Sequence, residues 1–184
     1  MQPVISPPPG KACPVVIRDH GHIEILAFAH PLAGLQLVKG TIEPGETSAA
    51  AALRELREES GLHASRVMAD LGVWASGYEN QIWAFYLCEV HHPPDSWTHR
   101  TSDNGGHDFR FFWHPLSQQP SAQWHWVYQR ALQYIASKLG RDTTGCDMPI
   151  VDTKCGERPS ALNLTIGLRC THYDKATREI IHEV

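Results

Sequence analysis

Residues 40–62 read GTIEPGETSAAAALRELREESGL, and this stretch decides the fold. Its second part predicts a helix over 47–60, because alanine, leucine, arginine and glutamate all have high helix propensity. Thr47 or Ser48 can cap the start of this helix, and Gly61 stands where a glycine commonly ends one. The expected buried stripe follows the i, i+3, i+4, i+7 rule and consists of Ala49, Ala52, Leu53 and Leu56.

Three carboxylates fall on one face of the predicted helix. Glu55, Glu58 and Glu59 stand at positions i, i+3 and i+4, which are neighbours on a helix surface. Anions so close repel one another, and a hard dication such as Mg²⁺ or Mn²⁺ would turn that repulsion into coordination. The alternative is a solvated charged face, on which an Arg–Glu pair four residues apart contributes only about 0.2–0.5 kcal/mol.

The loop before the helix favours the metal site. It has a glycine at each end, and glycine lets the backbone approach a ligand closely. A backbone carbonyl near Lys39 and Gly40 is therefore expected to join the carboxylates. Arg54 can reach back from the helix to Glu46 in the loop, so loop and helix are expected to act as one unit.

The whole stretch resembles the Nudix box, G-x5-E-x7-R-E-U-x-E-E-x-G-U, in which U is a bulky aliphatic residue. All nine defined positions match, namely Gly40, Glu46, Arg54, Glu55, Leu56, Glu58, Glu59, Gly61 and Leu62. The resemblance implies an α/β fold, a Nudix-type α/β/α sandwich with a mixed β-sheet. It also implies that Glu46 and Arg54 brace the loop and that Gly40 and Gly61 serve the backbone conformation.

The resemblance further implies a pyrophosphohydrolase that cleaves a diphosphate linkage in a nucleotide, with Mg²⁺ or Mn²⁺ as cofactor. Glu58 and Glu59 would be metal ligands, assisted by the main-chain carbonyl of Lys39. Glu55 would be a further ligand or the base that activates water. A dinucleoside polyphosphate or a nucleoside triphosphate is the favoured substrate.

Residues outside the box add weaker candidates. Many family members take one more acidic ligand from a loop, for which this chain offers Glu79, Asp103 and Asp108. Asp108 is preferred, because it precedes a short predicted strand and could project into the cleft. Lys39 could contact a phosphate, and Tyr78 resembles a tyrosine of some diadenosine polyphosphate hydrolases. Each of these residues could equally be an ordinary surface or strand-end residue.

Patterns elsewhere complete the domain organisation. Residues 1–10 are a proline-rich tail, 11–139 the Nudix domain, and 140–184 an extension of unknown role that begins with a linker and ends in a predicted hairpin over 162–170 and 178–184. Within the domain we expect a hairpin of 13–18 and 23–29, strands over 35–38, 66–74, 81–90 and 109–113, a long loop over 91–106, and a helix over 121–139.

Composition narrows the class of partner. The formal net charge is −4, which provides no basic footprint for nucleic acid, so we expect a small nucleotide as the ligand. The five cysteines form no C-x-x-C pair, which indicates free thiols in a reducing compartment. The N-terminus does not resemble a signal peptide and no apolar run approaches the ~20 residues of a membrane span. We therefore expect a soluble cytoplasmic protein, and a homodimer stays open.

Two alternative functions remain at this point. One is an RNA 5'-end pyrophosphohydrolase, which uses the same box but needs a basic path for the strand. The other is a non-catalytic Nudix module that senses a nucleotide. Such a module would be expected to lose box carboxylates, whereas this chain keeps them all.

Overall fold

The computed structural model describes residues 7–101 and 106–140. The described elements, in chain order, are β1 (Lys11–Val15), β2 (Ile17–Asp19), β3 (Ile23–His30), β4 (Gly34–Gln36), β5 (Gly40–Thr41), α1 (Ser48–Ser60), β6 (Arg66–Ala75), β7 (Ile82–Glu89), β8 (Trp97–Arg100), β9 (Asp108–Pro115) and α2 (Trp126–Lys138). Neither of these two helices is long and apolar enough to cross a bilayer. The hairpin predicted over 162–184, and most of both predicted tails, fall outside the described residues.

The strands form two sheets. The first has the order β5-β1-β7-β6 and is mixed, because β1 and β7 run parallel while the other pairs are antiparallel. The second has the order β2-β3-β9-β8, with β4 also paired to β3, and all its pairs are antiparallel. The predicted α/β class and mixed sheet are confirmed, and the second sheet is an addition.

The predicted hairpin of 13–18 with 23–29 is wrong in its first strand. Only β2 pairs with β3, with Ile17 opposite Ile25. The run before it, β1, leaves for the first sheet, where Cys13 lies opposite Phe85 of β7. The chain changes sheets at Val16, whose carbonyl still accepts a hydrogen bond from the Leu26 N–H at 2.9 Å. A strand buried on both faces reads as a continuous apolar run, which hides this change.

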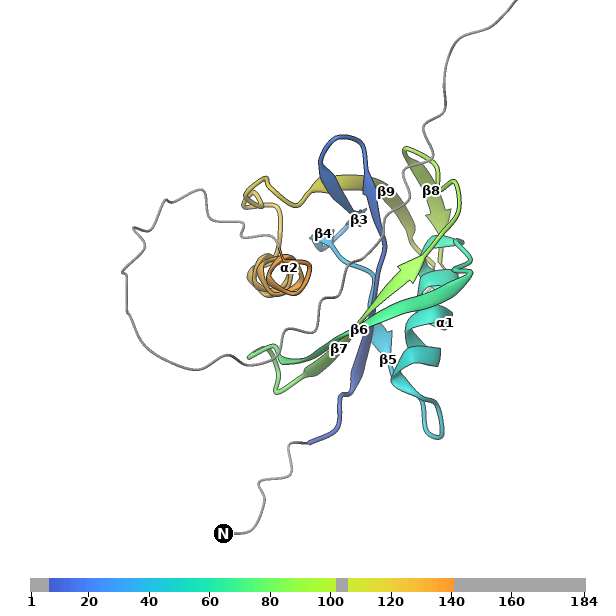
Figure 1. Ribbon diagram of the computed structural model, residues 1–184, viewed down its shortest axis with the longest axis vertical. Helices are drawn as coiled ribbons and strands as arrows, with labels where there is room; N and C mark the ends of the chain where they lie inside the picture. Colours follow the sequence, from blue (N-terminus) through green and yellow to red (C-terminus); the bar gives the residue numbers. More distant parts are fainter. Residues whose placement is uncertain (1–6, 102–105, 141–184) are drawn as a thin grey trace, which may run out of the picture. The chain divides into compact units, whose positions relative to one another are not determined.

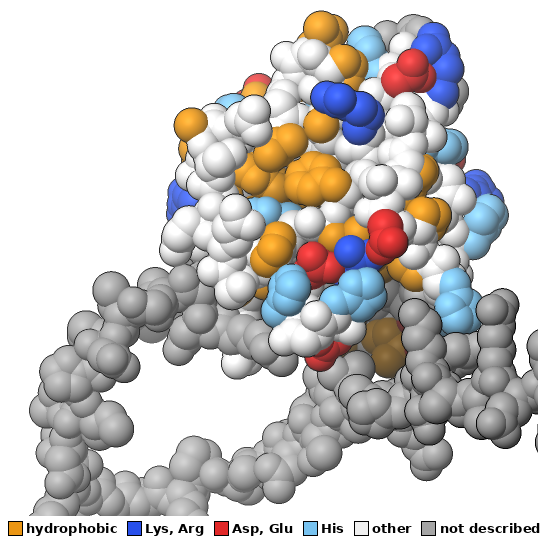
Figure 2. All heavy atoms as spheres, turned by 90° about the horizontal axis from the view of Figure 1, so that it is seen from above, with side chains coloured by type: hydrophobic (Ala, Val, Ile, Leu, Met, Phe, Trp, Pro, Cys, Tyr) orange, Lys and Arg blue, Asp and Glu red, His pale blue; other side chains and the backbone are white. Residues whose placement is uncertain are grey.

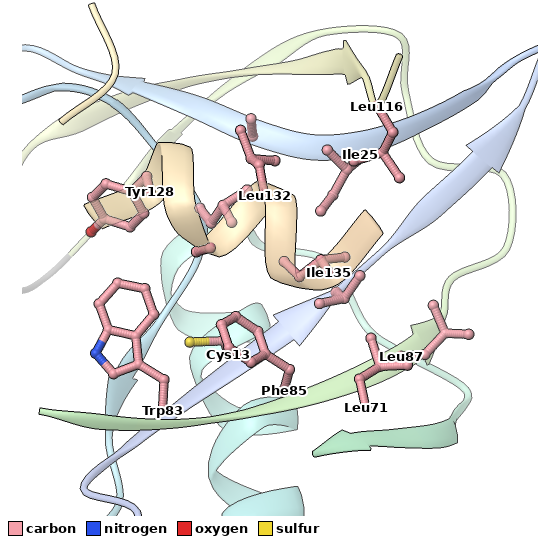
Figure 3. Packing of buried hydrophobic residues seen from close by; sticks show 14 of the residues in the cluster. Cys13, Ile25, Leu71, Trp83, Phe85, Leu87, Leu116, Tyr128, Leu132 and Ile135 are labelled. Carbon is pink, nitrogen blue, oxygen red and sulfur yellow. The ribbon is translucent and has the colours of Figure 1, made fainter. Parts of the chain in front are cut away.

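Side chains alternate along the strands between two hydrophobic clusters. In β7, Trp83, Phe85 and Leu87 join the cluster that contains the buried face of α2, whereas Ala84, Tyr86 and Cys88 join the cluster that contains the buried face of α1. Figure 1 shows the two helices on opposite sides of the strands. Figure 3 shows Leu132 and Ile135 of α2 above the β7 side chains. The strands are thus covered on both faces, which is the expected three-layer arrangement.

The predicted helix over 47–60 is confirmed as α1. The Thr47 side chain caps it by accepting a hydrogen bond from the Ala50 N–H at 3.2 Å. Gly61 ends it in the left-handed conformation, with φ of 75°. The buried stripe is rotated from the predicted one and consists of Ala51, Ala52, Glu55, Leu56 and Ser60.

The second helix and the long loop both differ from the prediction. Helix α2 begins at Trp126, five residues later than expected, because the side chain of His125 caps it and residues 121–124 form a turn. The predicted loop over 91–106 contains strand β8, which pairs with β9. Trp97 of β8 stacks on Phe111 with ring centroids 4.8 Å apart. The remaining predicted strands agree with β4, β6, β7 and β9 to within two residues at each end.

Candidate active site

The glycine that opens the box places the loop directly against α1. Gly40 lies in β5 opposite Ala12 of β1. A Cβ atom built on Gly40 would overlap all three atoms of the Glu55 carboxyl group. The Gly40 backbone is not in the left-handed region, so glycine is required here by close approach and not by a turn. Glu55 is consequently buried, with 6% of the residue exposed.

Arg54 connects the loop to the carboxylates of α1. Its Nε and Nη2 atoms donate to the two carboxylate oxygens of Glu46, both at 3.0 Å, so the predicted pair is present. Its Nη2 also donates to the Thr41 carbonyl at 2.9 Å. Its Nη1 donates to Glu55 at 2.8 Å and to Glu58 at 2.9 Å. One guanidinium thus donates hydrogen bonds to three carboxylates, which fixes their positions relative to the loop.

The same contacts alter the proton affinity of the pair. The hydrogen bond from Arg54 is the largest influence on Glu46 and lowers the pKa of its carboxyl group. In the other direction, the hydrogen bond to Glu46 is the main reason that the pKa of Arg54 is raised further above its ordinary value. Both groups therefore stay ionised over the whole physiological pH range.

The far end of α1 is held by strand β8. The Trp97 indole N–H donates to the Ser60 carbonyl at 2.8 Å. The His99 ring shares a hydrogen bond at 3.1 Å with the Glu58 carbonyl. A Cβ atom on Gly61 would lie only 2.9 Å from His99 Nδ1, so the glycine both ends the helix and admits this ring.

A hollow opens beside the third carboxylate. The Lys39 backbone N–H donates to Glu59 Oε2 at 3.3 Å. Both residues line a cavity of about 180 Å³, whose other walls are Phe28, His30, Gln36, Leu37, Thr101, His107, Phe109 and Tyr128. Figure 2 shows one face of the molecule on which acidic, basic and histidine side chains gather next to exposed apolar ones. The backbone of Lys39 therefore lies next to Glu59, and the expected role of its carbonyl as a metal ligand stays a prediction.

A second hollow lies next to the first. It has a volume of about 280 Å³ and is lined by Ala33, Gln36, Lys39, Tyr78, Trp83, His125, Val127 and Tyr128. Lys39, Gln36 and Tyr128 belong to both hollows. The Lys39 ammonium group lies 5.3 Å from the centre of the Trp83 ring and 5.9 Å from that of Tyr128. Lys39 therefore stands between a polar hollow and an aromatic one.

The candidate residues outside the box lie in different places, and only one of those described below lines a hollow. Tyr78 lines the second hollow, and its ring lies 5.3 Å from that of His125. Asp108 lines neither hollow and instead pairs with Arg100 of β8 at 3.2 Å. Its neighbours His107 and Phe109 do line the first hollow, because side chains alternate along a strand. The carboxylate of Glu79 accepts a hydrogen bond from Gln81 at 3.0 Å, and residue 103 falls outside the described part.

The box residues offer a set of oxygen donors to the predicted dication. Among residues 7–101 and 106–140, no three His, Cys, Asp or Glu side chains converge as a preformed metal cluster. Arg54 donates instead to both Glu55 and Glu58. The available donors are nevertheless all oxygens, from carboxylates and from the backbone at Lys39. Mg²⁺ commonly binds through one or two carboxylates and keeps several waters, so these residues fit it.

Comparison with known proteins agrees with this geometry. The family model described as NUDIX domain matches residues 8–134, and the chain therefore belongs to the Nudix family. Among solved structures, the Ap4A hydrolase of C. elegans is 21% identical, with a TM-score of 0.53 over 71% of this chain and 98% of that one. A MutT Nudix hydrolase from Burkholderia pseudomallei is 22% identical, with a TM-score of 0.52 over 71% and 99% of the two chains.

A third similar structure is the NUDIX domain of Shewanella oneidensis NrtR complexed with ADP ribose. It is 14% identical, with a TM-score of 0.52 over 76% of this chain and 93% of that one. A search of curated proteins finds no match. At these identities the structural likeness establishes the fold alone.

Proposed function

We propose that this chain is a Mg²⁺- or Mn²⁺-dependent pyrophosphohydrolase that cleaves a diphosphate linkage in a small nucleotide. The observation that carries the proposal is the folded geometry of the box. Glu59 is held by the Lys39 N–H, and both residues line one hollow. An oxygen-rich edge and an ammonium group therefore meet at the rim of this hollow, and that rim suits a metal-bound diphosphate.

Each box residue has a proposed task in this reaction. Glu58 and Glu59 would hold the cation together with the Lys39 carbonyl, and Glu55 is a further ligand or the base. When bound, the cation would neutralise charge on the diphosphate and lower the pKa of a bound water. The Glu55 carboxylate, buried and fixed by Arg54, would then accept the proton of the attacking water. The Lys39 ammonium group would bind a phosphate oxygen, and positioning supplies most of the remaining catalysis.

Substrate panels test this proposal directly. We expect wild-type protein with Mg²⁺ or Mn²⁺ to release phosphate or a nucleoside monophosphate from dinucleoside polyphosphates or nucleoside triphosphates, measured by product chromatography. Glu58→Gln and Glu59→Gln should each lower kcat by about 100-fold or more. Glu43→Gln makes the same chemical change at an exposed side chain of the loop and should keep the wild-type rate. Turnover that survives a chelator, or both box changes, contradicts the proposal.

A second candidate is a module that binds a nucleotide without cleaving it. Its support is the structural similarity to the NrtR domain complexed with ADP ribose. The same panel separates the two functions, because a binding module would show saturable binding of a nucleotide by calorimetry and no product after long incubation with metal.

A further inference from the structure

The two hollows beside Lys39 differ in size and in chemistry. Complete ligand pockets usually measure about 300–1,000 Å³. The aromatic hollow, at about 280 Å³, approaches that range and carries Tyr78, Trp83 and His125. The other, at about 180 Å³, is smaller and includes two histidines on its walls, His30 and His107. We call this smaller hollow the histidine lobe.

His30 stands at the end of β3 with one ring nitrogen already committed. Its Nδ1 accepts a hydrogen bond from the Leu32 N–H at 3.0 Å. A neutral imidazole that accepts at Nδ1 carries its proton on Nε2, so His30 offers an N–H donor there. Burial, reinforced by the charge of His107, lowers the pKa of His30. No other described group is hydrogen-bonded to His30 Nε2.

His107 enters the lobe from just before β9. Its backbone is fixed by Thr101, whose N–H donates to the His107 carbonyl at 2.9 Å and whose hydroxyl accepts from the His107 N–H at 3.4 Å. Its ring lies 5.0 Å from that of His30, between centroids. Within the described residues, neither of its ring nitrogens has a hydrogen-bond partner. The lobe thus presents, among the described residues, imidazole nitrogens that are free to hydrogen-bond a ligand.

Lys39 links the histidine lobe to the rest of the site. It lines both hollows, and its backbone N–H holds Glu59, the one acidic residue among the described residues of the lobe. A substrate with its base in the aromatic hollow and its diphosphate beside Lys39 would therefore direct its next group into the histidine lobe. Imidazole N–H donors and an ammonium group suit a phosphoryl oxygen at that place.

We propose that His30 and His107 bind the phosphoryl group that follows the cleaved linkage, and so select substrates with at least three phosphates in a row. The inference rests on the proposed function for its orientation of the substrate. We therefore expect nucleoside triphosphates and dinucleoside polyphosphates to be better substrates than nucleoside diphosphate sugars, because a sugar carries no charged phosphoryl oxygen for the two imidazole donors.

Kinetics on matched substrates test the selection. His30→Phe and His107→Phe keep a ring and remove the donor, so each should raise KM for ATP about tenfold, the effect of one hydrogen bond to a charged group. KM for a nucleoside diphosphate sugar should stay within about twofold. His30→Gln and His107→Gln restore an N–H donor and should recover most of the loss. His20→Phe, at an exposed position of the β2–β3 turn, should leave both KM values unchanged.

A binding measurement keeps the inference separate from catalysis. Calorimetric titration with inorganic tripolyphosphate should show an affinity about tenfold lower for the two Phe variants than for wild type and the His20→Phe control. Equal affinities across these proteins, or equal KM changes for both substrate classes, would refute phosphoryl binding by His30 and His107 and leave the proposed function intact. If the wild type cleaves no nucleotide but the Phe variants lose tripolyphosphate affinity, the proposed function fails and the phosphate site stands.

Discussion

Replacing Gly40 with alanine should change the catalytic rate much more than it changes the free energy of unfolding. The backbone of Gly40 lies outside the left-handed region, yet the new methyl group would come within 3.0 Å of all three atoms of the Glu55 carboxyl group. The carboxyl group must move by about 1 Å or more. Because it is the end of a flexible side chain, the fold can yield, and we expect the free energy of unfolding to fall by about 1–2 kcal/mol.

The loss of activity should be far larger. A displacement of about 1 Å in a catalytic group can cost about 100-fold in rate, and Glu55 would also lose its hydrogen bond to Arg54 at 2.8 Å. We therefore expect Gly40→Ala to unfold in urea close to wild type while its metal-dependent kcat falls about 100-fold. Gly10→Ala is the matched control, since a Cβ there meets nothing within 4 Å. A folded Gly40→Ala protein with kcat within about threefold of wild type would refute the close-approach argument.

Three further predictions concern the Glu46–Arg54 ion pair, two buried cysteines and the Trp97 indole. The pKa of Glu46 is lowered in the folded state, so its ion pair stabilises the fold fully above the ordinary carboxyl pKa, and this stabilisation is lost as pH falls through the pKa of the folded state. In Arg54→Ala the melting temperature should therefore fall less steeply with decreasing pH than in wild type, as measured by melting curves over a series of acidic pH values. Burial raises the pKa of Cys88 to about 11 and that of Cys13 further, so iodoacetamide at pH 8 should leave both unlabelled in native protein, read by peptide mass spectrometry. Trp97→Phe keeps its stacking but removes one hydrogen bond at the end of α1, and should lower the free energy of unfolding by about 1 kcal/mol in urea titration.

The box could be predicted from sequence because its interactions are local. The cap at Thr47, the end at Gly61 and the pair of Glu46 with Arg54 all lie within a few helical turns. The rotation of the buried stripe was not predictable in the same way. It depends on the contact between Gly40 and Glu55, which places the Glu55 carboxylate on the buried face of the helix.

The walls of the hollows could not be predicted, because they meet only after the strands pair. His30 ends β3 and His107 directly precedes β9, and no pattern in the sequence joins these two positions. Asp108, which is expected from sequence to project into the cleft, lines neither hollow. The residues on either side of it face the hollow, and a shift of one position along a strand moves a side chain to the opposite face.

The attachment of β8 to α1 bears on the order in which the molecule assembles. The box is contiguous in sequence, but Trp97 and His99, which fasten the end of its helix, come almost forty residues after it. Both residues belong to β8, and they are held in position for α1 by the pairing of β8 with β9. Contacts between distant parts of a chain form late because closing a long loop costs entropy. The helix and its Arg54 contacts can therefore form early, while the last turn of the helix becomes fixed against β8 only late in folding.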